Sequence, residues 1–521
     1  MAISILGEYD NEFNYKIIND PIYGCIGLSE TEVSLLDTRA MQRLRRIRQM
    51  GFTSYVFPSG EHSRFVHSLG VLFIAGKMCG LLYQKYGGSA DCHPKFTIHD
   101  VRLIRIAALL HDIGHFPFSH LCEYVYSYID LVKHLDPIIE SSGVKANDEP
   151  HVISAIANID KRKEKDHEHL SAEVIKKDPE ILTILKKAGI SPDEVGAIIT
   201  GDYSVSANPI HVQLLHSSLD ADRLDYLLRD SRQSGVSFGN VELDYILHQM
   251  RIERCPIRID GIEEHIECIV FDERGQHAIE HFLIGRYFHY SQVILHKASM
   301  AFEAIAKALI YKVLNSAECT AYASYESILE CIGNNDFYNF TDDFFWQFIC
   351  TYAKSTEDKL LKDLWVCLSQ RKKPVHVLTI TDIIPKTKTY SNAKPINNSM
   401  IHIANDLIQK SQDALAREAG IEPAYIGFVE SKVNLESISS HLRVEDCLFD
   451  EEDARGAIRI IDKDGKVSFL ASDKKSLINK MVDFTSNTLD IFVIGDAGET
   501  SAEKLCEIIN QKMMLHQNSM I

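Results

Sequence analysis

Histidine and aspartate side chains recur in three short segments of this chain. His67 lies in RFVHSLGV, His111 and Asp112 are adjacent in LLHDIGHFPFSH, and Asp222 lies in LDADRLDYLLRDS. Imidazole and carboxylate groups together suit a divalent ion such as manganese, magnesium, iron or zinc, and the mixture does not fix which one binds. The segments therefore predict one metal site assembled from helices that lie far apart in the sequence.

The choice of the last ligand stays open at this point. Asp220 and Asp225 flank Asp222, and spacing alone does not decide which carboxylate binds the ion, since the others can cap a helix or face solvent. A single histidine in a helical segment is more often a core or surface residue than a ligand. The ordered combination of a histidine, a His-Asp pair and a later aspartate, with the histidine-rich run HDIGHFPFSH, favours the metal site over chance.

Basic and aromatic side chains accompany these candidates. Arg64 precedes His67 by three residues and His115 follows His111 by four, so each pair shares one helical face. Guanidinium groups bind phosphate oxygens in bidentate fashion. Converging helices of this kind predict a pocket for a phosphorylated sugar. A further helical face carries candidates for the same pocket: Asp222, Tyr226 and Asp230.

Helices must position these groups, and the spacing of apolar residues predicts them over most of residues 30–313. Asp100 is the expected N-cap of a helix through DVRLIRIAALLHDIG, residues 134–166 are expected at the surface, and residues 255–273 alternate like a hairpin. AYIGFV, GAIRIID, VSFLA and LDIFVIG resemble strands. We expect a mostly α protein with a helical body at 1–370 (metal core about 40–300), a helical and loop connection at 371–420, and a small α/β appendage at 421–521 that serves regulation or oligomerisation.

Composition limits the partners and the compartment. The 521 residues suggest two to four domains, and the net charge of -18 disfavours a nucleic-acid strand spread over the surface while allowing a small anion in a basic pocket. Twelve cysteines without a CxxC pair suit a reducing compartment. We expect a cytoplasmic protein with no signal peptide, because no run reaches the length of a membrane span.

Several motifs together resemble a known family. HSLGV, HDIGHFPFSH and DADRLDYLLRDS occur in the order typical of the HD-domain superfamily of metal-dependent phosphohydrolases. KIINDPIYGCI, DTRAMQRLRRIRQMG, YVFPSGEHSRFVHSLGV and FGNVELDYI make the chain similar, more narrowly, to the deoxynucleoside triphosphate triphosphohydrolases. The resemblance covers about residues 16–300, weakens towards 370 and is absent from the last hundred residues.

This resemblance implies roles for individual residues. It assigns the metal to His67, His111, Asp112 and Asp222, and so selects one aspartate by analogy. His115 is implied as the proton donor to the leaving oxygen, with His120 and His167 orienting it. The implied substrate contacts are with the phosphates, sugar or base: Gln49, Arg64, Arg223, Tyr226, Asp230, Arg286, His296 and Lys297.

The chain also departs from the family pattern. Ile294 stands where the family has a tyrosine that packs on the sugar, and Tyr290 where it has a histidine, which implies looser sugar discrimination. Other positions match a site for an activating nucleotide in tetrameric members, although Asp37 and Arg45 could equally form an internal ion pair. The complete set is Lys16, Asn19, Asp37, Gln42 and Arg45.

The expected reaction is metal-dependent hydrolysis of a deoxynucleoside triphosphate to the deoxynucleoside and inorganic triphosphate. The resemblance also implies a homo-oligomer, a dimer or a tetramer. One alternative is another HD phosphohydrolase that acts on nucleoside monophosphates, NTPs, cyclic nucleotides or (p)ppGpp. A non-enzymatic alternative is a nucleotide sensor or a protein that binds single-stranded nucleic acid. Product analysis separates the enzymes, and the intact ligand set favours an enzyme over a sensor.

Overall fold

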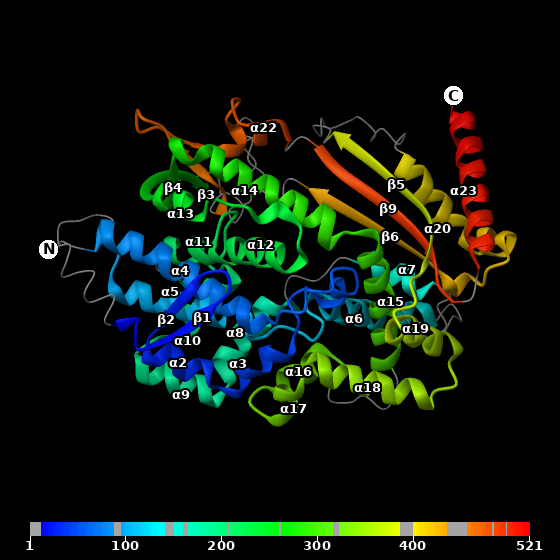
Figure 1. Ribbon diagram of the computed structural model, residues 1–521, viewed down its shortest axis with the longest axis horizontal. Helices are drawn as coiled ribbons and strands as arrows, with labels where there is room; N and C mark the ends of the chain where they lie inside the picture. Colours follow the sequence, from blue (N-terminus) through cyan, green and yellow to red (C-terminus); the bar gives the residue numbers. More distant parts are fainter. Residues whose placement is uncertain are drawn as a thin grey trace.

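A helical body with two small sheets towards the C-terminal part forms the fold (Figure 1), as expected from the sequence. The computed structural model describes residues 12–87, 95–140, 151–159, 165–206, 208–259, 262–315, 322–385, 400–434, 456–481, 484–495 and 498–520. One hydrophobic cluster runs through it, from Phe13 near the N-terminal end to Met513 in the last helix. The helical body and the C-terminal elements therefore share a core.

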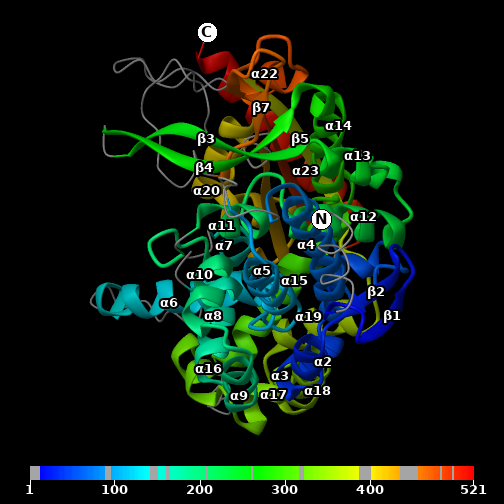
Figure 2. The ribbon, with the colours of Figure 1, turned by 90° about the vertical axis from the view of Figure 1, so that its left-hand side faces the viewer.

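Helix α4, Arg64–Tyr86, and helix α5, Ile98–Leu110, lie side by side at the centre of the body (Figure 2). Thr97 caps α5 and forms a capping box with Asp100, so Asp100 is the third helical residue and not the N-cap expected from the sequence. The surrounding helices are α2 Glu30–Leu36, α3 Arg39–Arg43, α6 His120–Glu140, α7 Val152–Ala157, α8 His167–Lys177, α9 Pro179–Ala188, α10 Pro192–Thr200, α11 Pro209–Leu215, α12 Ala221–Ser234, α13 Leu243–His248, α14 Gln276–His289, α15 Lys297–Leu314, α16 Tyr325–Cys331, α17 Asn335–Asn339, α18 Asp342–Ser355 and α19 Lys359–Ser369.

Helix α4 corrects one expectation about membrane-span length. It has 23 residues and a mean hydropathy of 1.7 over its most apolar window, enough by length and composition to cross a bilayer. However, 72% of that window is buried inside the protein. The apolar run is explained by its central place in the core, where it packs against α5 and α12.

Three sheets are present in the described residues. The hairpin β1 Lys16–Asp20 and β2 Gly24–Leu28 is antiparallel. A second hairpin, β3 Met250–Ile259 and β4 Ile262–Asp272, confirms the expected hairpin and begins five residues earlier. Strands β7 Arg459–Ile461 and β8 Val467–Phe469 extend that sheet in the order β3-β4-β7-β8. The third sheet is antiparallel in the order β5-β9-β6, with β5 Val375–Pro385, β6 Ile426–Asn434 and β9 Phe484–Val493.

The strands after residue 420 thus divide between two sheets. GAIRIID and VSFLA supply β7 and β8, which join a hairpin of the body, while AYIGFV and LDIFVIG supply β6 and β9. Strand β5 lies in the segment expected as a helical and loop connection, and pairs along β9 from Val375 to Pro385. Helices α20 Met400–Ala419 and α23 Glu499–Met520 pack on β5 (Figure 1), and α22 Leu477–Met481 lies near α14.

Residues 134–166 are less exposed than the sequence suggested. Residues 141–150 and 160–164 lie outside the described residues, but α7 between them buries Val152, Ile153 and Ile156 against the core. Helix α7 contacts both α15 and β6. A short apolar helix within the polar stretch therefore anchors the C-terminal sheet to the body.

Candidate metal centre and substrate cavity

Three helix ends bring the expected metal ligands together. His67 lies in the first turn of α4, His111 at the C-cap of α5 and Asp222 in the first turn of α12. The Nε2 atoms of the two histidines are 3.3 Å apart, and His67 Nε2 lies 2.9 Å from Asp222 Oδ1. One ligand atom from each of the three residues falls within 4.8 Å of the others, a spacing that could hold a metal ion.

The second nitrogen of each ring is held by the protein. His67 Nδ1 donates to the Asp225 carboxylate at 2.8 Å, and His111 Nδ1 donates to the carbonyl oxygen of Ala108 at 2.8 Å. These bonds leave both Nε2 atoms available to a metal and fix the ring orientations. Gly70 makes the first contact possible, because a Cβ at that position would lie 1.9 Å from Asp225 Oδ1.

Asp112 completes the ligand group from the side of Arg64. Its Oδ1 is 3.4 Å from His111 Nε2, and its Oδ2 accepts a hydrogen bond from Arg64 Nη1 at 2.8 Å. The Arg64 side chain is buried and its Nε donates to Ser119 Oγ at 2.9 Å. Burial raises the pKa of the Asp112 carboxyl, but the nearby positive charges, Arg64 first among them, outweigh burial and hold that pKa well below its usual range.

Charge around the ligands fits a cation. Burial lowers the pKa of His67, but its hydrogen bonds to the Asp222 and Asp225 carboxylates outweigh burial and raise that pKa to about 10. A centre that stabilises a positive charge on a buried ring also favours a metal ion in its place. Two imidazoles and two carboxylates form a donor set suited to iron, manganese or zinc.

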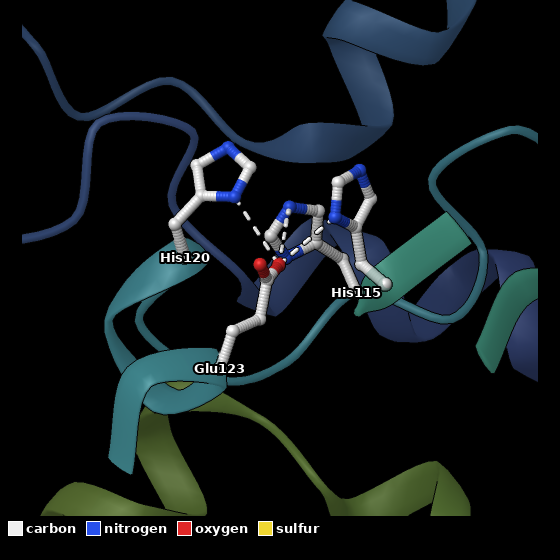
Figure 3. A group of neighbouring side chains, drawn as sticks. His115, His120 and Glu123 are labelled. Atoms are coloured by element: carbon white, nitrogen blue, oxygen red, sulfur yellow. Dashed lines mark hydrogen bonds and ion pairs between the residues drawn. The ribbon is translucent and has the colours of Figure 1, made fainter. Parts of the chain in front are cut away.

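Next to this centre lies a cluster of three histidines and one glutamate. Glu123 Oε1 accepts from His167 Nδ1 at 2.9 Å and from His120 Nδ1 at 3.2 Å, and lies 3.9 Å from His115 Nε2. Figure 3 shows the Glu123 carboxylate facing the rings of His115 and His120. The four residues, His115, His120, Glu123 and His167, form a second group whose ligand atoms lie within 4.8 Å of one another.

The environments of the three histidines differ, and this difference changes the expected roles. His115 is fully buried, and burial together with Arg64 and His167 holds its pKa well below the usual value. Neither of its ring nitrogens has a hydrogen bond among the described residues. Burial also lowers the pKa of His167, but Glu123 outweighs it and raises that pKa to about 8. The electrostatics therefore favour a protonated His167 and a neutral His115, which makes His167 the better candidate for the donor role that the resemblance gave to His115.

Backbone geometry places this cluster. Phe118 and Ser119 precede α6 and adopt left-handed φ angles of 55° and 59°, a conformation that non-glycine residues rarely adopt. Ser119 Oγ donates to the carbonyl oxygen of Arg48, and Phe118 N donates to Asp342 Oδ1. Gly114 N donates to Ser171 Oγ of α8, so the loop after the His-Asp pair packs directly on the helix that begins at His167.

A cavity of ≈ 240 Å³ opens on three of the four expected metal ligands and on His120 and His167, whereas His67 and His115 are not among its lining residues. It brings together residues expected from the sequence, including three arginines. Glu168, Ile199, Leu215 and His216 also line it and were not expected. The expected residues on its wall are Gln49, Arg64, His111, Asp112, His120, His167, Asp222, Arg223, Tyr226 and Arg286, and Tyr290, a departure from the family pattern, lines it too.

Three expected substrate contacts lie elsewhere. Asp230 is not among the residues that line the cavity, and its carboxylate accepts from His62 Nε2 and His289 Nε2, each at 3.0 Å. His296 is the N-cap of α15, and Lys297 follows it, and neither lines the cavity. Asp230 therefore contacts the cavity only indirectly: it holds His289, whose ring stacks on that of Tyr226 with the ring centres 5.3 Å apart.

The five residues expected at an activating-nucleotide site lie on the β1–β2 hairpin and around α3, away from the cavity wall. Arg45 Nε donates to Gln42 Oε1 at 2.7 Å, and its guanidinium lies over the Phe65 ring at 3.7 Å. Among the described residues no ion pair joins Asp37 to Arg45, so the alternative of an internal ion pair is wrong. Lys16 is exposed, and Asn19 accepts from the thiol of Cys25.

Comparison with known proteins places the chain. The family model described as "HD domain" matches residues 64–199. The uncharacterized protein MG461 of Mycoplasma genitalium is 30% identical over 369 residues, which cover 66% of this chain and 75% of that protein. The chain belongs to the HD-domain superfamily of phosphohydrolases. It is related to the dNTPase branch: a Dictyostelium discoideum homolog of the deoxynucleoside triphosphate triphosphohydrolase SAMHD1 is 33% identical over 238 residues, 44% of this chain and 40% of that protein.

The fold agrees with that membership. The crystal structure of a phosphohydrolase from Bacteroides thetaiotaomicron superposes with a TM-score of 0.58 at 22% identity, covering 92% of this chain and 99% of that one. At 22% sequence identity, this superposition shows a similar fold and no more. The chain spans about half the length of the first curated relatives it matches, 55% and 49%.

Proposed function

We propose that this HD phosphohydrolase is a metal-dependent deoxynucleoside triphosphate triphosphohydrolase that releases the deoxynucleoside and inorganic triphosphate. One observation carries the proposal: three of the four expected metal ligands, His111, Asp112 and Asp222, line the same cavity as three arginines. These arginines are Arg64, Arg223 and Arg286. Three fixed guanidinium groups beside a metal suit a chain of several phosphates better than a single phosphate. The similarity to SAMHD1 proteins supports the same substrate class.

The arginines are held before any ligand binds. Arg223 pairs with the Asp220 carboxylate, which also caps α12, and Arg286 Nε donates to Tyr226 Oη at 3.0 Å. Arg64 is fixed by Asp112 and Ser119. Fixed donors aimed at a developing phosphate charge stabilise the transition state without reorganisation.

His67, His111, Asp112 and Asp222 would hold the divalent ion, which supplies Lewis-acid polarisation of a phosphate group. The remaining chemistry falls to the chain. His167 lies on the cavity wall with its Nδ1 bound to Glu123. Its Nε2, 3.9 Å from Asp112 Oδ1, is the nitrogen that would give a proton to the leaving 5′-oxygen. His120 shares the Glu123 carboxylate and orients it.

Tyr226 and Gln49 are the sugar contacts in this proposal. The Tyr226 ring lines the cavity between the Arg286 guanidinium and the stacked ring of His289. The side-chain oxygen of Gln49 is buried and has no hydrogen-bond partner among the described residues, so a ligand hydroxyl is a suitable donor to it. An activating nucleotide, assembly into a dimer or tetramer and a cytosolic location stay predictions.

The test is product analysis of the purified protein with manganese or magnesium against all dNTPs and NTPs, singly and mixed. Inorganic triphosphate with the nucleoside supports the proposal, whereas orthophosphate or pyrophosphate contradicts it. Replacing His111 and Asp112 together by Ala should abolish hydrolysis. Asp112 also pairs with the buried Arg64, so the double variant could lose stability as well as the metal. Asp222→Asn is therefore a second variant, because the Asp222 side chain is partly exposed and its replacement should leave the protein folded.

A further inference from the structure

The turn that leads into α6 has a strained backbone. Phe118 and Ser119, the two residues before the helix, both adopt left-handed φ angles, 55° and 59°. Non-glycine residues rarely adopt this conformation, and it persists only where surrounding contacts hold the backbone in place. The next residue, His120, lines the cavity of the metal centre. The contacts that hold this turn therefore also hold a residue of the candidate active site.

A carboxylate from a distant helix holds the turn. Asp342 is the first residue of α18. Its Oδ1 accepts a hydrogen bond from the amide of Phe118 at 2.6 Å, and its Oδ2 accepts one from the amide of Arg48 at 2.9 Å. Asp342 is only 2% exposed, and an ionised oxygen that accepts from backbone amides makes a strong hydrogen bond. One buried side chain thus ties together two segments next to the cavity.

Each of these two segments places residues of the cavity wall. Gln49 follows Arg48 directly in the chain. Ser119 Oγ donates to the carbonyl oxygen of Arg48 at 2.6 Å and accepts from Arg64 Nε at 2.9 Å. Gln49, Arg64 and His120 all line the cavity. The carboxylate on α18 therefore supports an amide, a guanidinium and an imidazole of the site, although it does not line the cavity itself.

Helix α18 also packs on the turn through an aromatic ring. Trp346, one helical turn after Asp342, lies edge-on to the Phe118 ring with the ring centres 6.5 Å apart, and Phe52 packs on the same ring at 5.2 Å. A Cβ at Gly51 would lie 3.2 Å from the carbonyl oxygen of Phe118, so the chain approaches the turn closely there. Ring packing and hydrogen bonds together hold the turn against α18.

The ionised carboxyl lowers the stability of the fold. Burial raises the pKa of Asp342 to about 6, although its bonds to the two amides and the charge of Arg48 act in the opposite direction. Arg43, Asp343 and the buried thiol of Cys122 also face it. Because this pKa lies above its ordinary value of 3.8, the group lowers stability as the pH rises through that interval. Charge kept at the expense of stability indicates a role in the site.

We propose that Asp342 is a positioning residue of the active site. Its two oxygens hold the turn so that His120 meets the Glu123 carboxylate, to which His120 Nδ1 donates at 3.2 Å (Figure 3). The same carboxylate accepts from His167, the proposed proton donor. The turn also presents its serine hydroxyl to Arg64. This proposal rests on the proposed function, because it takes the cavity to be the site of hydrolysis.

The experiment measures kcat and KM for dNTP hydrolysis across pH in Asp342→Asn, which keeps the size of the side chain but has one acceptor oxygen and no charge. Asp343→Asn, the exposed neighbour on the same helix, is the matched control. At neutral pH, kcat of Asp342→Asn should fall about tenfold or more, the effect of one lost hydrogen bond to a charged group. The wild type and the control should lose kcat below about pH 6, where Asp342 takes up a proton. Asp342→Asn should lack this acid limb, because its side chain does not titrate.

Titration of manganese monitors the fold in the same samples. Its affinity should stay unchanged, because the proposed ligands lie on or next to α4, α5 and α12 and not on the turn. Wild-type kcat in Asp342→Asn, or a wild-type acid limb in that variant, would overturn the proposal. An equal fall of kcat and manganese affinity would overturn it as well, because that pattern belongs to a damaged fold.

NMR of the histidine rings separates the two proposals, since it needs no substrate. If no dNTP is hydrolysed, the proposed function fails. A ring resonance of His120 that moves in Asp342→Asn still supports the positioning role, provided that the resonance of His211, which is held by Asp100 at 2.7 Å, stays in place. An unmoved His120 resonance would overturn that role.

Discussion

Asp225 is the best place to test how the protein holds its metal ligands. It is fully buried on α12 and does not bind the proposed ion itself. Its carboxylate accepts from His67 Nδ1 at 2.8 Å, from Arg229 Nε at 2.9 Å and from Tyr23 Oη at 2.6 Å. Asp225→Asn keeps the size of the side chain but removes its charge and one acceptor oxygen.

Two consequences follow from these contacts. Removing one partner of a buried ion pair lowers the free energy of unfolding by about 3–5 kcal/mol. Arg229 keeps Asp20 as a second partner at 3.0 Å. We therefore expect a loss at the lower end of this range, about 3 kcal/mol. Loss of the carboxylate that orients a histidine ligand typically lowers metal affinity about 10–100-fold. The variant should therefore lose both stability and metal affinity.

The assay combines urea unfolding of the metal-free protein with titration of manganese. Gly70→Ala provides a second route to the same result, since its Cβ would lie 1.9 Å from Asp225 Oδ1 without changing any charge. Asp244→Asn is the matched control, because the Asp244 side chain is 71% exposed and its one ion pair among the described residues is with Lys77 at the surface. Wild-type metal affinity in Asp225→Asn, with the protein folded, would refute the role assigned to this carboxylate.

Two further results are expected. Glu123→Gln should move the alkaline limb of the kcat profile to lower pH: Glu123 raises the pKa of His167 to about 8, so without its charge the proton is lost earlier, and an unchanged limb would exclude His167 as the proton donor. Removal of the metal by a chelator should lower the unfolding midpoint in a thermal scan, because an ion free at 100 times its Kd stabilises the fold by about 2.7 kcal/mol; an equal midpoint with and without manganese would contradict a metal site.

Much of the site could be predicted because ligand chemistry belongs to the side chains themselves. His67, His111, Asp112 and Asp222 are recognisable by type and order, and helical spacing places Arg64 on the face of His67. The mostly α fold follows in the same way from the period of apolar residues. Residue type and the spacing of apolar residues are local properties of the chain, so they can be read from a single sequence.

Neighbouring residues of equal chemistry could not be told apart by spacing. Asp220, Asp222 and Asp225 lie within one and a half helical turns, yet Asp220 caps α12, Asp222 faces His111 and Asp225 faces the back of His67. Each role depends on the direction in which α12 meets α4. That direction is fixed by the packing of the two helices around Gly70, not by either segment alone.

The sequence by itself determined which groups could bind a metal and a phosphate, because residue type and helical period are properties of the chain. The tertiary structure alone decided how the histidine environments differ, because only folding buries His115 without a hydrogen-bond partner among the described residues and sets His167 against Glu123. It also placed strand β6 and Lys307 of α15 on the wall of one cavity of ≈ 530 Å³. Contacts between segments hundreds of residues apart arise from packing, which no local pattern encodes.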